Sequence, residues 1–272
     1  MTENKSNITG FSPAVKTGLG VCLLAGLLII VDAWLAVVPL AGFFLLCLAA
    51  PFFPRFGFYL PVISKGTSGK NAVAITFDDG PDPLTTPLLL KLLERYGINA
   101  TFFMTGKKAA RHPELVKQLV RRGHLVGNHS FNHSYRVLFK TSSSIAEDIN
   151  AAQNVFNDLG IRPLAYRPPA GITSPGLWSA LLKTNLYAIN FSCRPLDGGN
   201  RRISNIAGKI LDRIHPDDIV LLHDLRPPDE RLIPAWLNEI EILLKGIDKK
   251  GLAVLPLSEL IGQPVMISAE SS

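Results

Sequence analysis

The feature that most constrains the fold is an alternation of short apolar runs with amphipathic segments, which starts near residue 71. The short runs are typical of buried strands and the amphipathic segments of surface helices. Glycines follow several of the helical segments and would end each helix before the next strand. We expect strands over 72–77, 100–106, 124–128, 164–169, 187–192, 218–224 and 252–257, and helix-ending glycines at Gly97, Gly123, Gly160 and Gly251. About seven such strand–helix units predict an α/β fold with a parallel sheet, closed into a barrel or doubly wound.

A second feature is an apolar run over residues 18–53 that contains one charged side chain, Asp32. Hydrophobic residues make up 47% of the chain and charged residues 18%, and the apolar excess is concentrated in this run. It is too long for the apolar core of a signal peptide, although a cleaved signal remains an alternative. The run therefore predicts a transmembrane helical segment. We expect Asp32 to lie between helices or near an interface rather than to act chemically.

The same run is longer than one straight membrane-spanning helix needs, so a helical hairpin that reverses near Pro39 is favoured. A hairpin puts both of its ends on one side of the membrane. Basic residues flank both ends, at Lys5, Lys16, Arg55, Lys65 and Lys70. The positive-inside rule then predicts a bacterial inner-membrane protein with a cytoplasmic catalytic domain. A single span with an external domain is the alternative.

These features divide the chain into an N-terminal tail (1–17), the membrane segment (18–53), a linker (54–70), the catalytic domain (71–256) and a C-terminal tail (257–272). Cys193 is the one cysteine outside the apolar run, so the catalytic domain can form no internal disulfide. The net charge of +6 suits anionic lipid or a phosphorylated substrate. The basic residues form no patch interleaved with aromatic residues, so we expect no nucleic-acid partner.

Candidate catalytic side chains follow four of the predicted strands. Asp78 and Asp79 end the first, His129 and His133 follow the third, and the fourth and sixth are followed by the arginine of RPPAG and the histidine of LLHD. Ligand sites of parallel α/β folds lie at the carboxyl ends of the strands, so these groups are expected to meet. Two imidazoles four residues apart share a face if their segment is helical, and with one carboxylate they suit a divalent transition metal. Three other histidines are interpreted as structural: His112, His124 and His215.

The segments TFDDGPD, HSFNH, RPPAG and LLH occur in this order. In these motifs the chain resembles the polysaccharide deacetylases, carbohydrate esterase family four, also called the NodB-homology domain, over roughly residues 71–256. The resemblance implies a distorted (β/α) barrel of about seven strands. It implies that Asp78 is the general base, that Asp79, His129 and His133 bind the metal, and that His223 is the general acid.

The resemblance also implies that Arg167 orients the base and that Asp197, the acid of the fourth motif, helps to hold that arginine. Leu221 would line the acyl pocket. Ala170 stands where the family usually has tyrosine, so the side chain that borders the sugar is missing. The backbone N–H of Ala170 can still stabilise the oxyanion. In the fourth motif, Arg194 stands where the family often has an acidic residue, and Gly198 stands where it usually has tryptophan. Both differences alter the wall of the site that faces the sugar.

The expected activity is metal-dependent hydrolysis of an N-acetyl or N-formyl group on an amino sugar, in an envelope glycan or on a lipid carrier at the membrane. Amide hydrolysis needs a metal that polarises the carbonyl and lowers the pKa of water, together with a base and an acid. Zinc is favoured, with cobalt, nickel or manganese as alternatives. Two other functions use the same fold: a catalytically silent glycan-binding barrel, and an O-acyl esterase with the same site.

Overall fold

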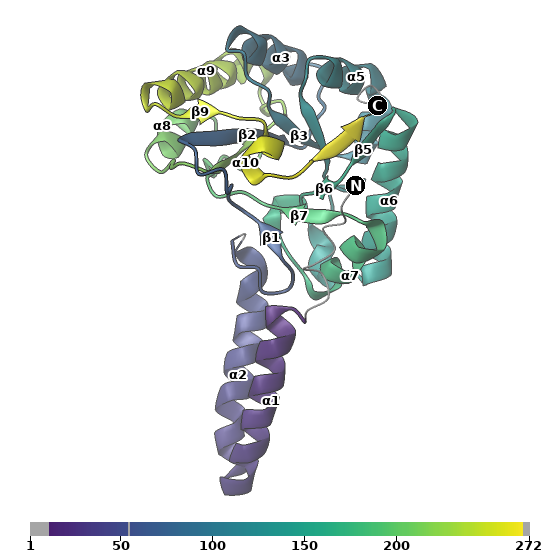
Figure 1. The fold of residues 1–272 in the computed structure, drawn as a ribbon, viewed down its shortest axis with the longest axis vertical. Helices are drawn as coiled ribbons and strands as arrows, with labels where there is room; N and C mark the ends of the chain where they lie inside the picture. The colour runs from purple at the N-terminus through teal and green to yellow at the C-terminus, as the bar shows by residue number, and fades with distance from the viewer. Residues whose placement is uncertain (1–10, 54, 269–272) are drawn as a thin grey trace.

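The computed structural model describes residues 11–53 and 55–268. At its N-terminal end two apolar helices, α1 (Pro13–Val31) and α2 (Ala33–Ala49), lie side by side and project from the rest of the protein (Figure 1). Both are long and apolar enough to cross a membrane by length and composition, counting α2 through the short helix η1 (Ala50–Phe52). Their apolar side chains point outward, and Ile30 and Trp34 are 82% and 80% exposed. Lys5, in the expected N-terminal tail, lies outside the described residues.

The chain reverses at Asp32, so the predicted reversal near Pro39 is wrong. Asp32 has an extended backbone and its carboxylate accepts a hydrogen bond from the N–H of Trp34, at 2.9 Å, which caps the start of α2. Pro39 lies inside α2. An N-cap carboxylate satisfies a backbone donor that the first helical turn leaves free, whereas a proline within an apolar helix removes a single donor. The capping residue therefore sets the turn.

The remainder of the chain is built on a curled parallel sheet in the order β1, β7, β6, β4, β3, β2, β8, with β9 also paired to β2. The strand bounds are β1 (Val62–Ile63), β2 (Ala72–Asp78), β3 (Thr101–Met104), β4 (Leu125–Asn128), β6 (Ala165–Tyr166), β7 (Tyr187–Ile189), β8 (Ile219–His223) and β9 (Ala253–Val254). A parallel bridge between Cys193 and Val220 draws the two ends of the sheet together. The predicted distorted barrel with an apolar helical segment is confirmed, and each of the seven expected strands is present.

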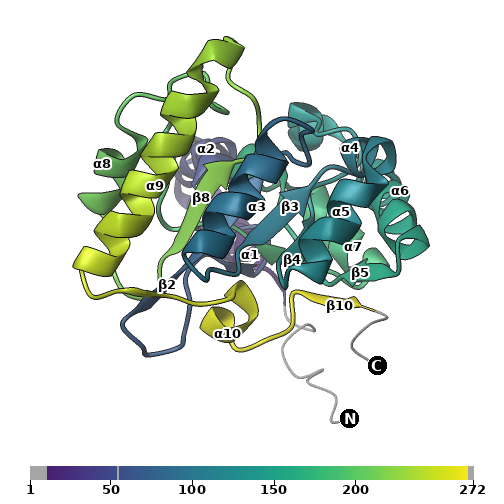
Figure 2. The same cartoon turned by 90° about the horizontal axis from the view of Figure 1, so that it is seen from above.

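Helices cover the outside of this sheet, and α9, α3 and α5 follow one another across it (Figure 2). Their bounds are α3 (Thr85–Arg95), α4 (Gly106–Arg111), α5 (Pro113–Arg121), α6 (Ser142–Asp158), α7 (Pro175–Thr184), α8 (Ile206–Leu211) and α9 (Ile233–Lys249). Short helices η2 (Tyr135–Phe139), η3 (Pro169–Gly171) and η4 (Glu230–Leu232) lie in loops. The four predicted glycines, listed above, adopt positive φ after α3, α5, α6 and α9.

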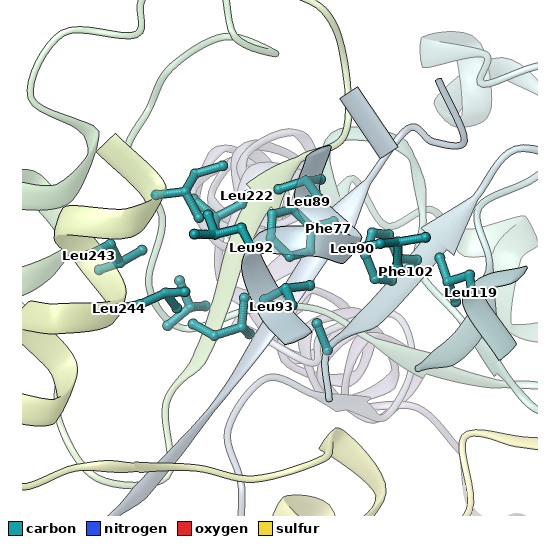
Figure 3. Close-up of a cluster of buried hydrophobic side chains, with 14 of the residues drawn as sticks. Phe77, Leu89, Leu90, Leu92, Leu93, Phe102, Leu119, Leu222, Leu243 and Leu244 are labelled. Carbon is teal, nitrogen blue, oxygen red and sulfur yellow. The ribbon is translucent and has the colours of Figure 1, made fainter. Parts of the chain in front are cut away.

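The largest hydrophobic cluster lies between the sheet and helices α3, α5 and α9 (Figure 3). Phe77 and Phe102 from neighbouring strands stack with ring centroids 5.0 Å apart, and Trp236 of α9 is 1% exposed. Full burial of such side chains stabilises the fold by roughly 1.5–3 kcal/mol each. The catalytic candidates are not part of this cluster, so the sheet holds its edge loops in place independently of them.

The segment expected to be a linker, 54–70, is instead packed into the domain where the structure describes it. Phe58, Tyr59 and Leu60 are buried beside the base of the hairpin, and β1 joins the sheet through β7. The Tyr59 hydroxyl donates to the Cys47 carbonyl at 2.6 Å, which fixes the segment against α2. The sequence of this segment lacks a clear strand pattern because β1 is two residues long.

The C-terminal segment expected to be a tail is also part of the fold over its described residues, 257–268. Helix α10 (Leu257–Ile261) buries Leu257 and Leu260 against the sheet. Strand β10 (Met266–Ser268) pairs antiparallel with β5 (Ile161–Pro163) outside the main sheet. The domain therefore extends beyond both predicted limits, residues 71 and 256.

Candidate metal centre and active site

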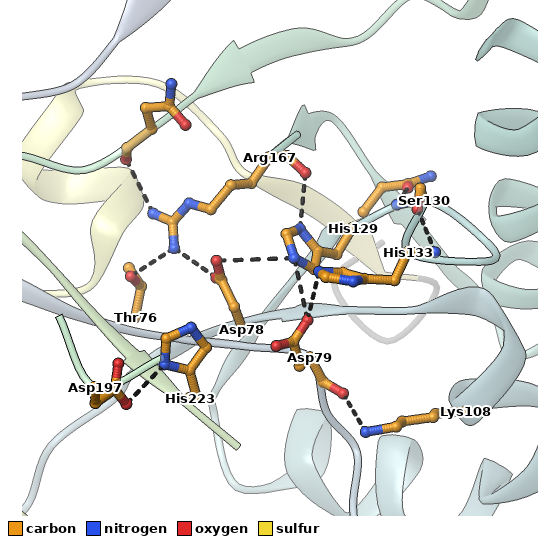
Figure 4. A network of polar contacts seen from close by, with 12 residues as sticks. Thr76, Asp78, Asp79, Lys108, His129, Ser130, His133, Arg167, Asp197 and His223 are labelled. Carbon is orange, nitrogen blue, oxygen red and sulfur yellow. Dashed lines mark hydrogen bonds and ion pairs between the residues drawn. The ribbon is translucent and has the colours of Figure 1, made fainter. Parts of the chain in front are cut away.

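The predicted catalytic residues meet at the carboxyl edge of the sheet (Figure 4). Asp78 ends β2 and His223 ends β8, and the two are direct partners in the parallel pairing of these strands. His129 follows β4 and Arg167 follows β6. Side chains at one end of adjacent parallel strands converge, and this pairing brings together groups that lie far apart in the sequence.

Asp78 and Asp79 can both face the site because the strand ends between them. Asp79 has φ of 73°, in the left-handed region that non-glycine residues seldom occupy. Lys108 of α4 donates from Nζ to the Asp79 carbonyl at 2.7 Å and supports this conformation. Burial is the main reason that the pKa of Lys108 is lowered.

The two predicted metal-binding histidines converge on Asp79. Its Oδ1 lies 2.9 Å from His133 Nε2 and 3.4 Å from His129 Nε2. The segment that joins the histidines is a loop, so the condition of a helix does not hold, and Ser130 and His133 have φ of 65° and 54°. The Ser130 hydroxyl accepts a hydrogen bond from the His133 N–H at 3.0 Å and closes this loop.

The donor set fits a divalent metal. Nδ1 of His129 lies 2.8 Å from the Arg167 carbonyl, which can only accept, so Nδ1 carries the proton. In the neutral ring the Nε2 lone pair then faces Asp79, and Asp79 Oδ1 accepts no well-formed hydrogen bond from the described residues. One ligand atom from each of the three residues lies within 4.8 Å of the others.

Asp78 is held by Arg167 rather than by the three candidate metal ligands. The fully buried guanidinium donates from Nη1 to Asp78 Oδ1 at 2.7 Å and to the Thr76 hydroxyl at 2.8 Å. Nη2 donates to the Asn190 carbonyl at 3.0 Å. The guanidinium carbon also lies 4.0 Å from the centroid of the Phe103 ring. Arg167 therefore fixes Asp78 through its side chain and His129 through its carbonyl.

Asp197 contacts His223, and the expected contact with Arg167 is not found. Its Oδ2 accepts a hydrogen bond from His223 Nδ1 at 2.9 Å. Burial disfavours the charged imidazole, but this contact and the charge of Asp197 outweigh it, so the pKa of His223 is raised. Asp197 therefore stabilises the charged form of the His223 imidazole. Arg167 is instead held by Asp78, Thr76 and the Asn190 carbonyl.

The two residues expected to bind substrate lie on different parts of the edge. Ala170 is exposed, in η3, with φ of 55°. Leu221 is buried in β8, in a hydrophobic cluster with Phe103 and Phe191.

A cavity of about 330 Å³ opens beside the candidate metal ligands. Its lining includes Asp79, His133, Phe131, Tyr135 and Lys108.

Asp224 is an important buried residue that the sequence did not single out. Its carboxylate accepts hydrogen bonds from the hydroxyls of Thr85 and Thr86 at 2.7 and 2.6 Å, which fixes the start of α3. Burial raises its pKa to about 7. A Cβ on Gly80 would lie 2.4 Å from Asp224 Oδ2, so only glycine fits there. The signal available was an acid directly after the strand-end histidine.

The three histidines interpreted as structural lie away from the metal ligands. His124 is buried, accepts a hydrogen bond from the Ala100 N–H, and has its pKa lowered by burial to about 4. His112 is a helix-boundary residue between α4 and α5, and His215 is exposed before β8.

Comparison with known proteins identifies the class that this fold and site define. Residues 65–189 match the family model described as polysaccharide deacetylase. A peptidoglycan-N-acetylglucosamine deacetylase of Bacillus cereus is 33% identical over 196 residues, which is 71% of this chain and 90% of that protein. A chitooligosaccharide deacetylase of Azorhizobium caulinodans is 31% identical over 200 residues, covering 70% and 95%.

Solved structures agree. The crystal structure of a peptidoglycan N-acetylglucosamine deacetylase with a bound hydroxamate-type benzamide superposes with a TM-score of 0.66 at 26% identity, covering 75% of this chain and 94% of that one. A family 4 carbohydrate esterase from Streptomyces lividans, in complex with acetate, gives 0.61 at 29% identity, covering 71% and 96%. The chain belongs to the polysaccharide deacetylase family, carbohydrate esterase family four. It is a carbohydrate N-deacetylase, a hydrolase of non-peptide carbon–nitrogen bonds.

Proposed function

We propose that this protein is a metal-dependent, membrane-attached enzyme that removes an N-acetyl or N-formyl group from an amino sugar of an envelope glycan or a lipid-linked sugar. The observation that carries the proposal is the convergence of Asp79, His129 and His133, with Asp78 and His223 beside them (Figure 4). The relatives named above act on glycans that contain N-acetylglucosamine. A single carboxylate and two imidazoles favour zinc, although cobalt, nickel or manganese suits the same donors.

In this mechanism Asp79, His129 and His133 would hold a divalent metal, which would supply Lewis acidity at the acyl carbonyl. Asp78, paired with the guanidinium of Arg167, takes a proton from the attacking water. His223, protonated because Asp197 stabilises its charge, gives a proton to the departing nitrogen. The amide C–N bond breaks, and the products are a carboxylic acid and a free amino sugar.

The acyl group and the bond type can be tested by comparing matched substrates. Metal-loaded protein should release acid from N-acetyl or N-formyl glucosamine oligomers, with the appearance of a free amine. O-acetylated sugars that lack an N-acyl group provide the comparison, since an O-acyl esterase would use the same residues. Acid release from the O-acetyl sugar alone would overturn the amidase assignment, and no release from any acylated sugar would favour a silent barrel.

We expect His223→Ala to lower hydrolysis of the amide at least about a hundredfold, while hydrolysis of an activated aryl ester falls far less. A good leaving group departs without a proton, whereas an amine does not. The two rates are measured on the same metal-loaded preparation. Equal losses on both substrates would assign His223 to binding or oxyanion stabilisation instead.

The contact between Asp197 and His223 predicts the pH dependence. Because Asp197 raises the pKa of His223, the rate should fall as pH rises through that value and the acid loses its proton. Asp197→Asn should move this alkaline limb to lower pH. An unchanged limb would contradict the assignment of His223 as the titrating acid.

We propose that the helical hairpin anchors the protein in the bacterial inner membrane with its catalytic domain in the cytoplasm. The support is the pair of apolar helices, together with Lys16 and Arg55 at the two ends of the hairpin. A reporter fused after Ser272 should then behave as cytoplasmic. Activity of a reporter that works only in the periplasm would overturn this topology and favour an exported glycan as substrate.

A further inference from the structure

Two adjoining cavities lie where the hairpin meets the catalytic domain. The larger, about 470 Å³, lies at the end of α2, and apart from Arg55 its lining is apolar: Leu46, Ala49, Ala50, Phe53 and Phe56. The smaller, about 200 Å³, is lined by Phe53, Arg55, Phe191, Ser192 and Arg194. Phe53 and Arg55 line both, so the apolar cavity adjoins the cationic one.

The smaller cavity carries two guanidinium groups. Arg55 donates from Nη2 to the Ser192 carbonyl, and the guanidinium carbon of Arg194 lies 5.2 Å from the centroid of the Phe191 ring. Within the described residues neither arginine forms an ion pair, and no acidic side chain lines either cavity. Guanidinium groups form charge-assisted, often bidentate hydrogen bonds with phosphate oxygens. A phosphate therefore suits this cavity better than a neutral ligand does.

Phe191 connects this cavity with the catalytic edge. The ring that lies beside Arg194 also has its centroid 6.0 Å from the guanidinium carbon of Arg167. Arg167 in turn holds Asp78. One aromatic ring therefore separates the cationic cavity from the arginine that orients the proposed base.

The order of these environments, from α2 inward, is apolar, cationic and then catalytic. An amphipathic ligand with a hydrocarbon chain, a phosphate and a sugar has the same order of groups. The end of α2 is also where a membrane-embedded hairpin would reach the headgroup region, in which basic side chains commonly contact lipid phosphates.

We propose that Arg55 and Arg194 bind the phosphate of a lipid-linked amino sugar, with the first part of its hydrocarbon chain against Leu46, Phe53 and Phe56. This inference rests on the proposed function, whose substrate it narrows from any N-acylated amino sugar to one carried on a lipid phosphate. The sugar is then placed beside Phe191, on the side of the cavity that faces the catalytic edge.

The test compares two substrates on the full-length, metal-loaded protein in one detergent: polyprenyl phosphate N-acetylglucosamine and a soluble N-acetylchitooligosaccharide. Arg194→Gln should lower the ratio of kcat/KM for the lipid-linked substrate to that for the soluble one by about tenfold, the usual effect of losing one charge-assisted hydrogen bond. Arg55→Gln should act in the same direction. Arg121→Gln, which removes an exposed charge from α5, is the matched control and should leave the ratio unchanged.

The outcomes separate this inference from the function that it rests on. A wild-type protein that deacylates the oligosaccharide but not the lipid-linked sugar, or an unchanged ratio in Arg194→Gln, would overturn the phosphate site and leave the deacylase proposal intact. No activity on either substrate would instead count against the deacylase proposal. If bulk phospholipid were the ligand, added phosphatidylglycerol vesicles would change wild-type activity on the oligosaccharide but not that of Arg194→Gln, and this would also overturn the proposal.

Discussion

His133→Ala is expected to lose bound metal and hydrolytic activity together, while the fold persists. The substitution removes one of three donor atoms, and even changes outside the ligand set commonly cost ten- to a hundredfold in metal affinity, so we expect a loss of at least about a hundredfold. His133 lies in a loop with its side chain 19% exposed, away from the hydrophobic clusters, so its truncation leaves the sheet intact. Metal content by elemental analysis, the rate of acid release and the circular dichroism spectrum are compared with those of wild type.

The matched control is His215→Ala, which also removes an imidazole. This imidazole is exposed, and its carboxylate neighbour, Asp218, is not one of the proposed metal ligands. This variant should keep both metal and activity. Wild-type metal content in His133→Ala would remove His133 from the ligand set. Loss of the folded spectrum would show that the loop is structural, in which case His133→Gln replaces it as the test.

Asp78→Asn is expected to lower turnover at least about a hundredfold with metal content nearly unchanged. The amide keeps the shape of the carboxylate but cannot take a proton from water. Arg167 would then lack a charged partner in a buried site, so we also expect a lower melting temperature, since an uncompensated buried charge is destabilising. Turnover, metal content and melting temperature are measured on the same preparation.

Two results would contradict this assignment. Turnover within a few fold of wild type would show that Asp78 is not the base. Loss of the metal would show that Asp78 is itself a ligand, a role for which its position, with Oδ2 3.9 Å from His129 Nε2, makes it the nearest candidate after Asp79.

The sequence predicted the sheet well because its signals are local. Each expected strand is a short apolar run, and each glycine that follows α3, α5, α6 or α9 takes the positive φ that such a position requires. Once these strands are parallel, Asp78, His129, Arg167 and His223 necessarily reach the same edge. The convergence of the catalytic candidates could therefore be predicted from the strand order, without predicting the individual side-chain contacts.

The contacts themselves could not be predicted, because they depend on loop backbone and on carbonyl groups that the sequence does not reveal. His129 and His133 converge through a loop with two left-handed residues, and not through the shared helix face that their spacing would allow. The proton on His129 is fixed by the Arg167 carbonyl, and Asp197 reaches His223 across a long loop. The pairing of Asp197 was wrong for this reason.

The limits of the domain were missed where the elements are very short or where competing turn signals occur. β1 has two residues and β10 three, too few to show a periodic pattern. In the apolar run, Pro39 looked like the stronger break, yet the cap supplied by Asp32 sets the turn. An aspartate within an apolar run can therefore be the N-cap of a second helix, and need not be a polar group buried between two helices.

Metal removal and restoration on the wild-type protein tests the central claim most directly. The full-length protein is stripped with a chelator, and release of acetate and free amine from an N-acetylated glucosamine oligomer is followed as zinc is added back. Activity should be absent from the stripped protein and should rise in proportion to bound metal up to one ion per chain, the number that a single Asp79, His129 and His133 site can hold. Full deacylation by a protein shown to be metal-free would contradict the account.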